Sequence, residues 1–324
     1  MYPLERSRRL RKSAALRDLV RETQLSSDDF LVPLFVVEGK KKREAIPSMP
    51  SYERLSLDEL EKEVKLLWSM GLKAVLLFVK VDDALKDNAG TEALNPNGLM
   101  QRAIQTVKAA VPEMVVFTDV ALDPYSSFGH DGIVENNIIL NDATNQVLAQ
   151  MALSHAEAGA DVVAPSDMMD GRVKCIREEL EKHRFVDTCI MSYSAKYASG
   201  FYGPFRDALD SAPGFGDKKT YQMDFGNRLE ALKEVSRDVE EGADIVMVKP
   251  GIAYLDILRE ISNKVHVPVA VYQVSGEYAM LKAAAEKGWL DYESVMMEQL
   301  IAFKRSGASI IATYSAKEAV RLIC

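Results

Sequence analysis

The chain has 324 residues, of which 48% are hydrophobic, and its formal net charge at pH 7 is −8. A chain of this length can form one barrel-sized domain or two smaller ones, and its acidic balance argues against nucleic acid as a partner. No stretch approaches the roughly 18 apolar residues of a membrane span, and the amino terminus lacks the apolar region of a signal peptide. We therefore expect a cytoplasmic protein.

Residues 1–30 precede the repeating part of the chain and carry a run of basic side chains: Arg6, Arg8, Arg9, Arg11 and Lys12. Such a segment can bind RNA, remain a solvated tail or wrap a neighbouring subunit. We favour an arm for subunit contacts, because apolar residues are interspersed among the charges: Leu10, Leu16, Leu19 and Val20.

Eight short apolar runs follow, each bounded by turn residues, at 31–37, 73–79, 114–120, 160–166, 188–194, 243–249, 268–274 and 309–315. Most intervals between them have helical periodicity, as in 57–68, and four end in a glycine that can stop a helix: Gly71, Gly159, Gly242 and Gly307. Near-continuous apolar strands are typical of a parallel sheet covered by helices. Eight such units favour a (β/α)8 TIM barrel over residues 31–324, with an open doubly wound sheet as the alternative.

The interval 197–226 interrupts this repeat, because it is rich in Gly, Pro, Phe and Tyr and lacks an apolar period. A long segment without regular structure is usually functional or disordered. Its aromatic content favours an ordered role, and we interpret 197–226 as an active-site lid. A plain surface excursion is the alternative.

Polar side chains follow several predicted strands, and the carboxyl ends of barrel strands face one pocket. These residues are Asp123, Ser166, Lys196, Lys249, Ser275 and Tyr314. A lysine attacks a ketone only as the neutral amine, and at a pKa near 10.4 about 0.04% of it is neutral at pH 7. An apolar pocket and a second ammonium nearby both lower this pKa. We therefore interpret Lys196 and Lys249, which follow successive strands, as a catalytic pair rather than as members of salt bridges.

The lid adds three cationic side chains near this pocket: Arg206, Lys218 and Lys219. Arginine can bind a carboxylate or phosphate through two hydrogen bonds, and lysine binds it as a point charge. We expect Arg206 and Lys218 to bind a ligand and thereby order the lid, since only an anion would satisfy their charge. Ordinary loop solubility is the alternative for Lys219. Ser275 and Tyr314 can hydrogen-bond a second anionic group.

An acidic loop follows the third predicted strand and contains Asp119, Asp123, His130 and Asp131. These residues can ligate a metal, although Asp123 can also cap a turn before Pro124. The cysteines, Cys175, Cys189 and Cys324, lie far apart and form no C-x-x-C pair, so they indicate neither a zinc site nor a disulfide framework.

Six long motifs resemble those of the porphobilinogen synthase (5-aminolevulinate dehydratase) family, and the similarity runs from about Leu31 to the carboxyl terminus. The motifs are DVALDPYSSFGHDG, VVAPSDMMDGR, MSYSAKYASGFYGPFRDA, MVKPG, YQVSGEYAM and AFKRSGA. The resemblance implies a TIM barrel with an amino-terminal arm that embraces a neighbour in a homo-octamer. It implies an enzyme that condenses two 5-aminolevulinate molecules to porphobilinogen for tetrapyrrole (heme or chlorophyll) synthesis.

The resemblance also implies a role for each site residue. Lys249 corresponds to the lysine that forms a Schiff base with the first substrate, and Lys196 to the lysine that engages the second. Ser275 and Tyr314 correspond to the residues that hold the first carboxylate. The second carboxylate is held by the lid residues Arg206, Lys218 and Gln222.

The metal is where this sequence departs from zinc-dependent members, which carry cysteines at the positions of Ala121, Asp123 and Asp131. Thiolates select zinc, whereas carboxylates suit magnesium. We expect no catalytic zinc, and Asp123 and Asp131 hold either a metal or only water and a lysine. Glu234 corresponds to a ligand of an allosteric magnesium in other members, so we expect Mg²⁺ there.

Two other functions remain compatible with the residues alone. A class I aldolase would also be a Schiff-base barrel, but it would use one lysine. A non-catalytic scaffolding protein would need no neutral lysine. The two-lysine pattern favours the first interpretation over both.

Overall fold

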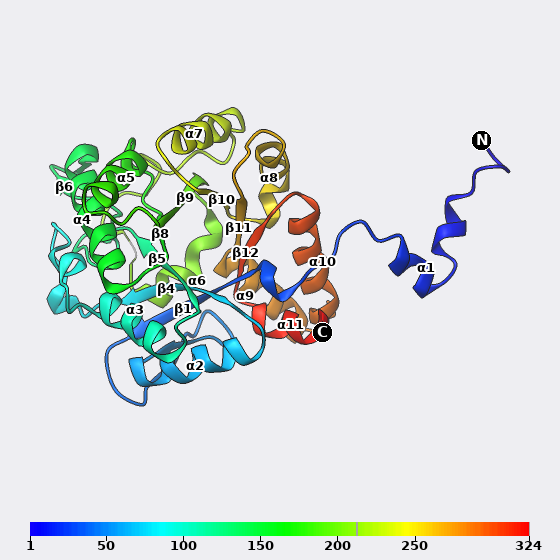
Figure 1. Cartoon of the computed structure of the whole chain (residues 1–324), viewed down its shortest axis with the longest axis horizontal. Coiled ribbons are helices and arrows are strands. Elements are labelled where there is room, and N and C mark those ends of the chain that lie inside the picture. The colour runs from blue at the N-terminus through cyan, green and yellow to red at the C-terminus, as the bar shows by residue number, and fades with distance from the viewer. Residues whose placement is uncertain (212, 324) are drawn as a thin grey trace.

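The computed structural model describes residues 1–211 and 213–323. Eight parallel strands close into a barrel because the last strand pairs with the first, which excludes the open sheet (Figure 1). All eight predicted strands and the (β/α)8 fold are confirmed. Their order is β1 (Phe30–Val37), β4 (Ala74–Lys80), β5 (Val115–Val120), β8 (Val162–Pro165), β9 (Cys189–Lys196), β10 (Ile245–Lys249), β11 (Val269–Gln273) and β12 (Ile310–Thr313).

Helices alternate with these strands and surround the barrel. They are α2 (Leu57–Ser69), α3 (Leu99–Ala110), α4 (Asn141–Ala158), α5 (Arg172–Lys182), α7 (Leu229–Glu240), α8 (Leu255–Ser262), α9 (Ser275–Glu286), α10 (Tyr292–Arg305) and α11 (Ala316–Ile323). Helix α2 buries the apolar positions that its periodicity predicts, Leu60, Val64 and Leu67. The four glycines before strands adopt positive φ angles, from 81° to 107°, which confirms their role in ending helices.

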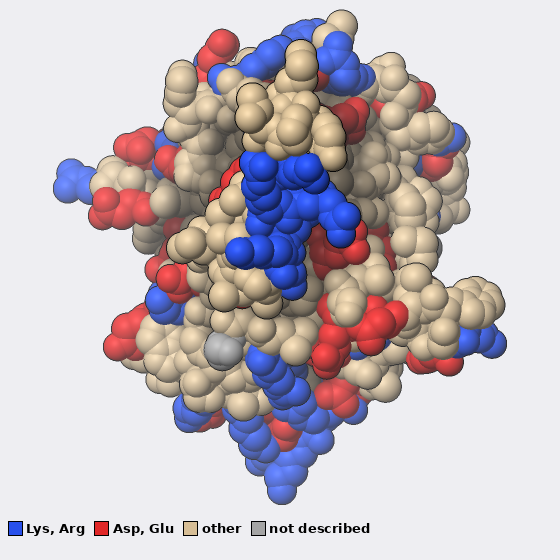
Figure 2. Space-filling model, turned by 90° about the vertical axis from the view of Figure 1, so that its right-hand side faces the viewer, with Lys and Arg blue, Asp and Glu red and all other residues tan. Residues whose placement is uncertain are grey.

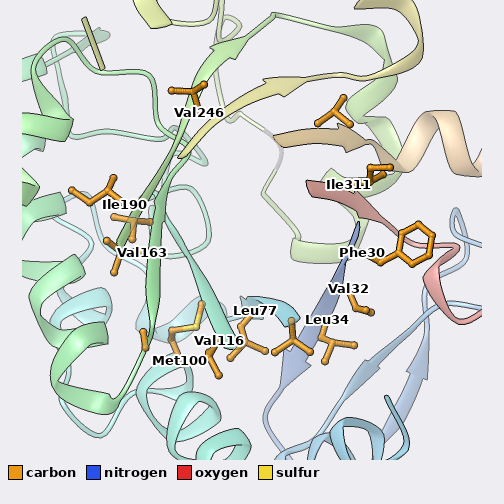
Figure 3. Packing of buried hydrophobic residues seen from close by; sticks show 14 of the residues in the cluster. Phe30, Val32, Leu34, Leu77, Met100, Val116, Val163, Ile190, Val246 and Ile311 are labelled. Carbon is orange, nitrogen blue, oxygen red and sulfur yellow. The ribbon is translucent and has the colours of Figure 1, made fainter. Parts of the chain in front are cut away.

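The buried hydrophobic residues form two groups, because successive side chains of a strand point to opposite faces. One group lies between strands and helices and includes Val32, Leu34 and Val246 (Figure 3). The other fills the barrel interior with large residues such as Phe35 and Tyr272. Each fully buried side chain of this size contributes about 1.5–3 kcal/mol to stability. The interior group is aromatic at the carboxyl ends of the strands, where polar side chains also gather.

Short elements extend the barrel at its edges. The hairpin of β2 (Arg43–Ala45) and β3 (Glu53–Leu55) lies beside β1, and β6 (Val134–Glu135) pairs with β7 (Ile138–Ile139). Single 3₁₀ turns occur at η1 (Ser7–Arg11), η2 (Ser27–Asp29), η3 (Asp83–Leu85), η4 (Thr91–Leu94), η5 (Gly200–Tyr202) and η6 (Ile252–Tyr254).

The amino-terminal segment extends away from the barrel (Figure 1). It contains η1 and the short helix α1 (Ala14–Leu19), neither of which buries a residue. Basic side chains gather on this segment when the molecule is viewed along it (Figure 2). Leu4, Leu10 and Leu19 are exposed alongside them. The segment thus presents apolar and cationic side chains that its own barrel does not cover.

The interval 197–226 contains more regular structure than its sequence indicates. It forms η5 and the helix α6 (Gly203–Leu209), which buries Ala208 and Leu209. The expectation of a segment without regular structure was therefore wrong, because Gly203 and Pro204 begin the helix and conceal its short apolar period. Pro at the first turn is compatible with a helix, since the missing N–H would have no partner there.

No helix in the described part of the chain is both long and apolar enough to cross a membrane. Cys175 and Cys189 are free thiols. Cys324 lies outside the described residues.

Candidate active site

Two lysines lie side by side at the carboxyl ends of adjacent strands. Lys196 is the last residue of β9 and Lys249 the last of β10, and the strand register pairs them directly. Both side chains are buried, with 6% and 5% of the residue exposed. The structure therefore brings together the two residues that the sequence singles out, at the end of the barrel where (β/α)8 enzymes hold their active sites.

Lys249 lies in a cage of aromatic rings. Its Nζ is 4.8 Å from the centroid of the Tyr272 ring and 4.9 Å from that of Phe205, with Tyr193 and Tyr202 at 5.0 and 5.3 Å. No carboxylate in residues 1–211 and 213–323 forms an ion pair with it. Burial lowers the pKa of Lys249 to about 7, and the charge of Lys196 acts in the same direction. About half of the amine is then neutral at pH 7, which makes Lys249 a nucleophile.

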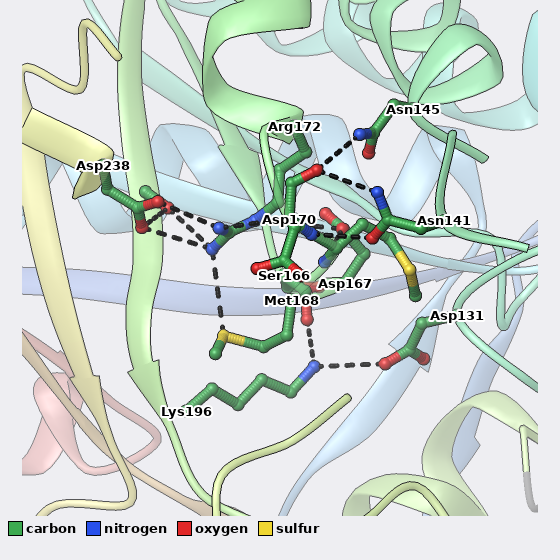
Figure 4. A network of polar contacts seen from close by, with 12 residues as sticks. Asp131, Asn141, Asn145, Ser166, Asp167, Met168, Asp170, Arg172, Lys196 and Asp238 are labelled. Atoms are coloured by element: carbon green, nitrogen blue, oxygen red, sulfur yellow. Dashed lines mark hydrogen bonds and ion pairs between the residues drawn. The ribbon is translucent and has the colours of Figure 1, made fainter. Parts of the chain in front are cut away.

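Lys196 has different surroundings. Its Nζ donates to the carbonyl oxygen of Ser166 and lies 3.4 Å from Oδ2 of Asp131 (Figure 4). The expectation that neither lysine takes part in a salt bridge was therefore wrong for Lys196. The reason is that the acidic loop folds over the end of β9, which strand order alone does not reveal.

The acidic loop binds the lid through Lys218. Nζ of Lys218 lies 2.6 Å from Oδ1 of Asp131 and 3.3 Å from Oδ2 of Asp123, and all three side chains are buried. Burial alone would raise the pKa of Asp131, but Lys196 and Lys218 outweigh it and hold that pKa at about 2. Burial raises the pKa of Asp123, which Lys218 only partly offsets. The expectation that only a bound anion satisfies Lys218 was wrong, because these two carboxylates do so.

The other two residues of the acidic loop serve different purposes. Asp119 is the fifth residue of β5 and is buried, and burial followed by the charge of Asp123 raises its pKa to about 7. Its Oδ1 has no hydrogen-bond partner among the described residues. His130 contacts the lid instead, since its ring nitrogens lie 3.0 Å from the Tyr221 hydroxyl and 3.1 Å from the Phe215 carbonyl. Asp119 is thus available to a ligand, whereas His130 anchors the lid.

Ser275 and Tyr314 lie on the other side of Lys249, after β11 and β12. Ser275 is the first residue of α9, and its buried Oγ finds no hydrogen-bond partner within the described part of the chain. The Tyr314 hydroxyl lies 3.0 Å from that of Tyr272, whose ring belongs to the cage. A helix amino terminus and two hydroxyls suit a carboxylate.

The remaining lid residues differ in burial. Gln222 is buried, and its backbone N–H donates to the Lys218 carbonyl at 2.9 Å. Arg206 lies on α6 and is half-buried. Its guanidinium makes no hydrogen bond or ion pair with the residues described. Lys219 is exposed and lies 3.6 Å from Asp217. Arg206 is therefore the lid cation whose charge is left for a ligand.

Glu234 lies on α7, in a surface cavity of about 250 Å³ that is separate from the cage around Lys249. Burial raises its pKa, and its Oε1 lies 3.3 Å from Nη1 of Arg237. Asp170 and Asp238 line the same cavity. Among the described residues, no group of three His, Cys, Asp or Glu side chains is arranged to hold a metal.

The sequence interpretation missed the aromatic cage. Tyr193 and Tyr272 occupy inward-facing positions of β9 and β11, so strand alternation could have identified both. Tyr202 and Phe205 come from the lid, where only the high aromatic content gave a signal. The cage depends on how the lid packs, since Phe205 also contacts Phe35 and Phe78 at centroid distances of 5.8 and 5.0 Å.

A buried amine that is half neutral near pH 7, at the mouth of a (β/α)8 barrel, is suited to attack a ketone, so the fold and site define a Schiff-base enzyme. The comparison with protein families identifies which one. The chain belongs to the family of delta-aminolevulinic acid dehydratase, whose model matches residues 4–322.

Individual relatives agree over nearly the whole length. The delta-aminolevulinic acid dehydratase of Methanothermus sociabilis is 55% identical over 322 residues, covering 99% of each chain. That of Bacillus subtilis is 50% identical and covers 98% of this chain and 97% of its own. A crystal structure of the Toxoplasma gondii enzyme (porphobilinogen synthase) with its reaction product porphobilinogen superposes with a TM-score of 0.96, at 52% identity, over 98% of this chain and 91% of that chain.

Proposed function

We infer that this chain condenses two molecules of 5-aminolevulinate to one porphobilinogen, with the loss of two waters, in tetrapyrrole synthesis. The observation that carries the inference is Lys249, a buried strand-end amine with a pKa of about 7 in an aromatic cage. Family membership supplies the substrate, since the relatives are delta-aminolevulinic acid dehydratases.

Each side of the barrel mouth suits one substrate. Lys249 forms an imine with the ketone of the first substrate, and the hydroxyls of Ser275 and Tyr314 hold its carboxylate. Lys196 engages the second substrate, whose carboxylate is held by Arg206, Gln222 and Lys218. Support for this division is that Ser275 Oγ and Arg206 have no partner among the described residues. To bind the second substrate, Lys218 must release the carboxylate of Asp123 or Asp131 and pair with the carboxylate of the substrate instead.

The chemistry then follows from imine formation. Attack of the neutral Lys249 amine on the ketone releases water, and the resulting iminium acidifies the neighbouring C–H protons. A carbon of the second substrate, after losing its proton, bonds to the iminium carbon, and the amino group of the first substrate attacks the second ketone and expels the second water. Elimination of the Lys249 amine and loss of a proton then give the aromatic pyrrole and free the lysine. Holding both substrates at one barrel mouth removes much of the entropic cost of joining them. Asp119, with a pKa of about 7, is suited to accept or return a proton.

Formation of the pyrrole from 5-aminolevulinate alone tests the proposed function. Borohydride reduction during turnover should leave a substrate adduct on the peptide that contains Lys249. A class I aldolase would give an adduct but no pyrrole, and a scaffolding protein would give neither.

We propose that 197–226 acts as the lid of this site. Its tip contacts the acidic loop through the 2.8 Å bond from Gly214 N–H to the Phe128 carbonyl and through the Phe215 ring, whose centroid lies 4.5 Å from that of His130. At its base, the buried Arg54 donates to the carbonyls of Asp207 and Ala208. Opening near the tip would break the Lys218 pairs, whereas exposing Lys249 also requires Tyr202 and Phe205 at the base to move.

We propose that residues 1–30 hold a homo-oligomer together, an octamer by family resemblance. The exposed Leu10 and Leu19 support this, because single apolar side chains on an extended segment gain most by packing on a neighbour. Deleting residues 1–25 should lower the mass in sedimentation, whereas replacing Arg8 and Arg9 by Lys in the full chain should not. An unchanged mass after deletion would make the segment a solvated tail.

We propose that Mg²⁺ binds at Glu234 and acts allosterically, and that no zinc takes part in catalysis. The cavity offers the Glu234 carboxylate with Asp170 nearby, which fits a hydrated magnesium, since this ion keeps several waters and uses one or two carboxylates. Asp123 and Asp131 are engaged by Lys218 and offer no thiolate, so they do not fit a zinc site.

A further inference from the structure

Glu277 is a buried carboxylate with no role in the site described so far. It lies in the first turn of α9 and is completely buried. Its Oε2 accepts from the backbone N–H of Val274 at 2.7 Å and from that of Gly251 at 3.4 Å, and Oε1 accepts from Ile252 N–H at 2.5 Å. Unlike Asp131, it receives only backbone donors among the described residues.

These bonds join two segments that carry substrate-binding residues. Pro250 follows Lys249 and has no N–H of its own, so Gly251 and Ile252 carry the first backbone N–H groups after the lysine. Val274 precedes Ser275. One carboxylate therefore connects the backbone behind the imine-forming lysine to the backbone that presents the carboxylate-binding hydroxyl.

Close packing leaves both segments little room to move independently. A Cβ at Gly251 would lie 2.7 Å from Cε1 of Phe303 and 3.0 Å from the Tyr272 carbonyl oxygen. A Cβ at Gly276 would lie 2.4 Å from the Phe201 carbonyl oxygen. The carboxylate thus spans a tightly packed junction and connects its two sides, and burial raises its pKa to about 7 against the effect of its backbone donors.

We propose that Glu277 is a positioning residue that fixes the distance between Lys249 and Ser275, and that it thereby selects keto acids by chain length. This inference rests on the proposed function. A 4-oxo acid such as 5-aminolevulinate has two methylenes between ketone and carboxylate. If Glu277 holds both segments, an acid with a third methylene cannot place its ketone at Lys249 and its carboxylate at Ser275 together.

The test compares imine formation with 4-oxopentanoate and 5-oxohexanoate, trapped by borohydride and quantified on the Lys249 peptide. The wild type should favour 4-oxopentanoate at least about tenfold in trapping efficiency, a discrimination typical of one methylene. Glu277→Gln should reduce that ratio at least about fivefold, because the amide has one acceptor oxygen and turns an NH₂ group toward a backbone N–H. Glu277→Asp, which is too short to reach both segments, should do the same if the Gln variant folds poorly.

The control is Asp29→Asn at the opposite end of the barrel, which removes a buried carboxylate that accepts the Ser26 N–H at 2.8 Å and pairs with Lys304 at 2.6 Å. It should leave the ratio unchanged, as would any substitution that only lowers stability. An unchanged ratio in both folded Glu277 variants overturns the inference and leaves the proposed function intact. Absence of an adduct with either acid in the wild type overturns the Lys249 imine and this inference together.

Discussion

Lys249 and Lys196 are adjacent in register, equally buried and one strand apart, yet their neighbours differ in kind. Aromatic rings surround Lys249, and no described carboxylate pairs with it. Lys196 lies beside Asp131 and the Ser166 carbonyl. Burial among rings, next to a second cation, favours the neutral form of Lys249, whereas the described neighbours of Lys196 include the carboxylate of Asp131.

This difference suits two substrates that must react in turn. The amine without a carboxylate partner can attack a ketone near pH 7, whereas the paired one must first lose its contact with Asp131. Asp131 also binds Lys218 of the lid, so engagement of the second lysine and movement of the lid are linked through one carboxylate.

The largest effect should come from removing the unpaired amine. Lys249→Ala should lower turnover by about 10⁴-fold or more, since the nucleophile itself is lost, and it should abolish the borohydride adduct. Lys219→Ala, at an exposed lid lysine, should retain turnover within about twofold. Circular dichroism checks that both variants fold. Near-native turnover in Lys249→Ala would contradict the proposed mechanism.

The next effect should come from removing the shared carboxylate of the paired lysine. Asp131→Asn leaves Lys196 and Lys218 buried without their common anion, so the free energy of unfolding should fall by about 3 kcal/mol and turnover by roughly 10²-fold. Asp217→Asn removes the partner of the exposed Lys219 and should cost less than about 0.5 kcal/mol. Urea denaturation and steady-state kinetics distinguish the two. Equal losses of stability and turnover in both variants would show that the buried ion pairs of Asp131 contribute no more than the exposed pair of Asp217.

Sequence patterns predicted the unpaired and the paired lysine equally well, and only the family resemblance assigned them different roles. Strand periodicity and the end-of-strand rule placed both at the barrel mouth, because these depend on local patterns. The distinguishing neighbours come from the lid and the acidic loop, whose positions depend on tertiary packing. Phe205 and Lys218 were visible only as lid residues, and Glu277 was overlooked because a glutamate in a first helical turn is usually a solvated cap.

A smaller effect should appear in the pH dependence of imine formation at Lys249. The neutral amine reacts, so trapping by 4-oxopentanoate and borohydride should increase as pH rises through about 7 and then level off. Lys196→Met removes a charge that lowers the Lys249 pKa, and the midpoint should rise by up to about one pH unit. Asp131→Asn removes a charge that raises it, so the midpoint should fall. Shifts of the same sign in the two variants would show that the lysines are not coupled through charge.

A buried polar network extends from the surroundings of Lys196 to Arg172 and Asp238 (Figure 4). Nη1 of Arg172 lies 2.9 Å from Oδ1 of Asp238. The hydroxyl of Ser192, which lies on β9 four residues before Lys196, donates to Oδ2 of Asp238 at 2.7 Å. Arg172 also lies 3.8 Å from Asp167, which follows the carbonyl that holds Lys196. Asp238 and Arg172 line the cavity that contains Glu234. A cation at Glu234 would therefore act on the Lys196 side of the site and leave the cage of Lys249 unchanged.

The smallest effect should be the response to magnesium. Mg²⁺ should raise wild-type turnover a few-fold by adding positive charge beside Glu234, whose raised pKa reflects its burial. Glu234→Ala should abolish that stimulation while leaving basal turnover and the pH midpoint of imine formation at Lys249 within error. Glu230→Ala, four residues earlier on α7, is the matched control and should keep the stimulation. Stimulation retained in Glu234→Ala would move the magnesium site elsewhere.

Because the carboxylates near Lys218 do not suit zinc, turnover should also survive a zinc-selective chelator. Recovery of about one zinc per chain, lost together with activity, would refute the expectation that no zinc takes part in catalysis.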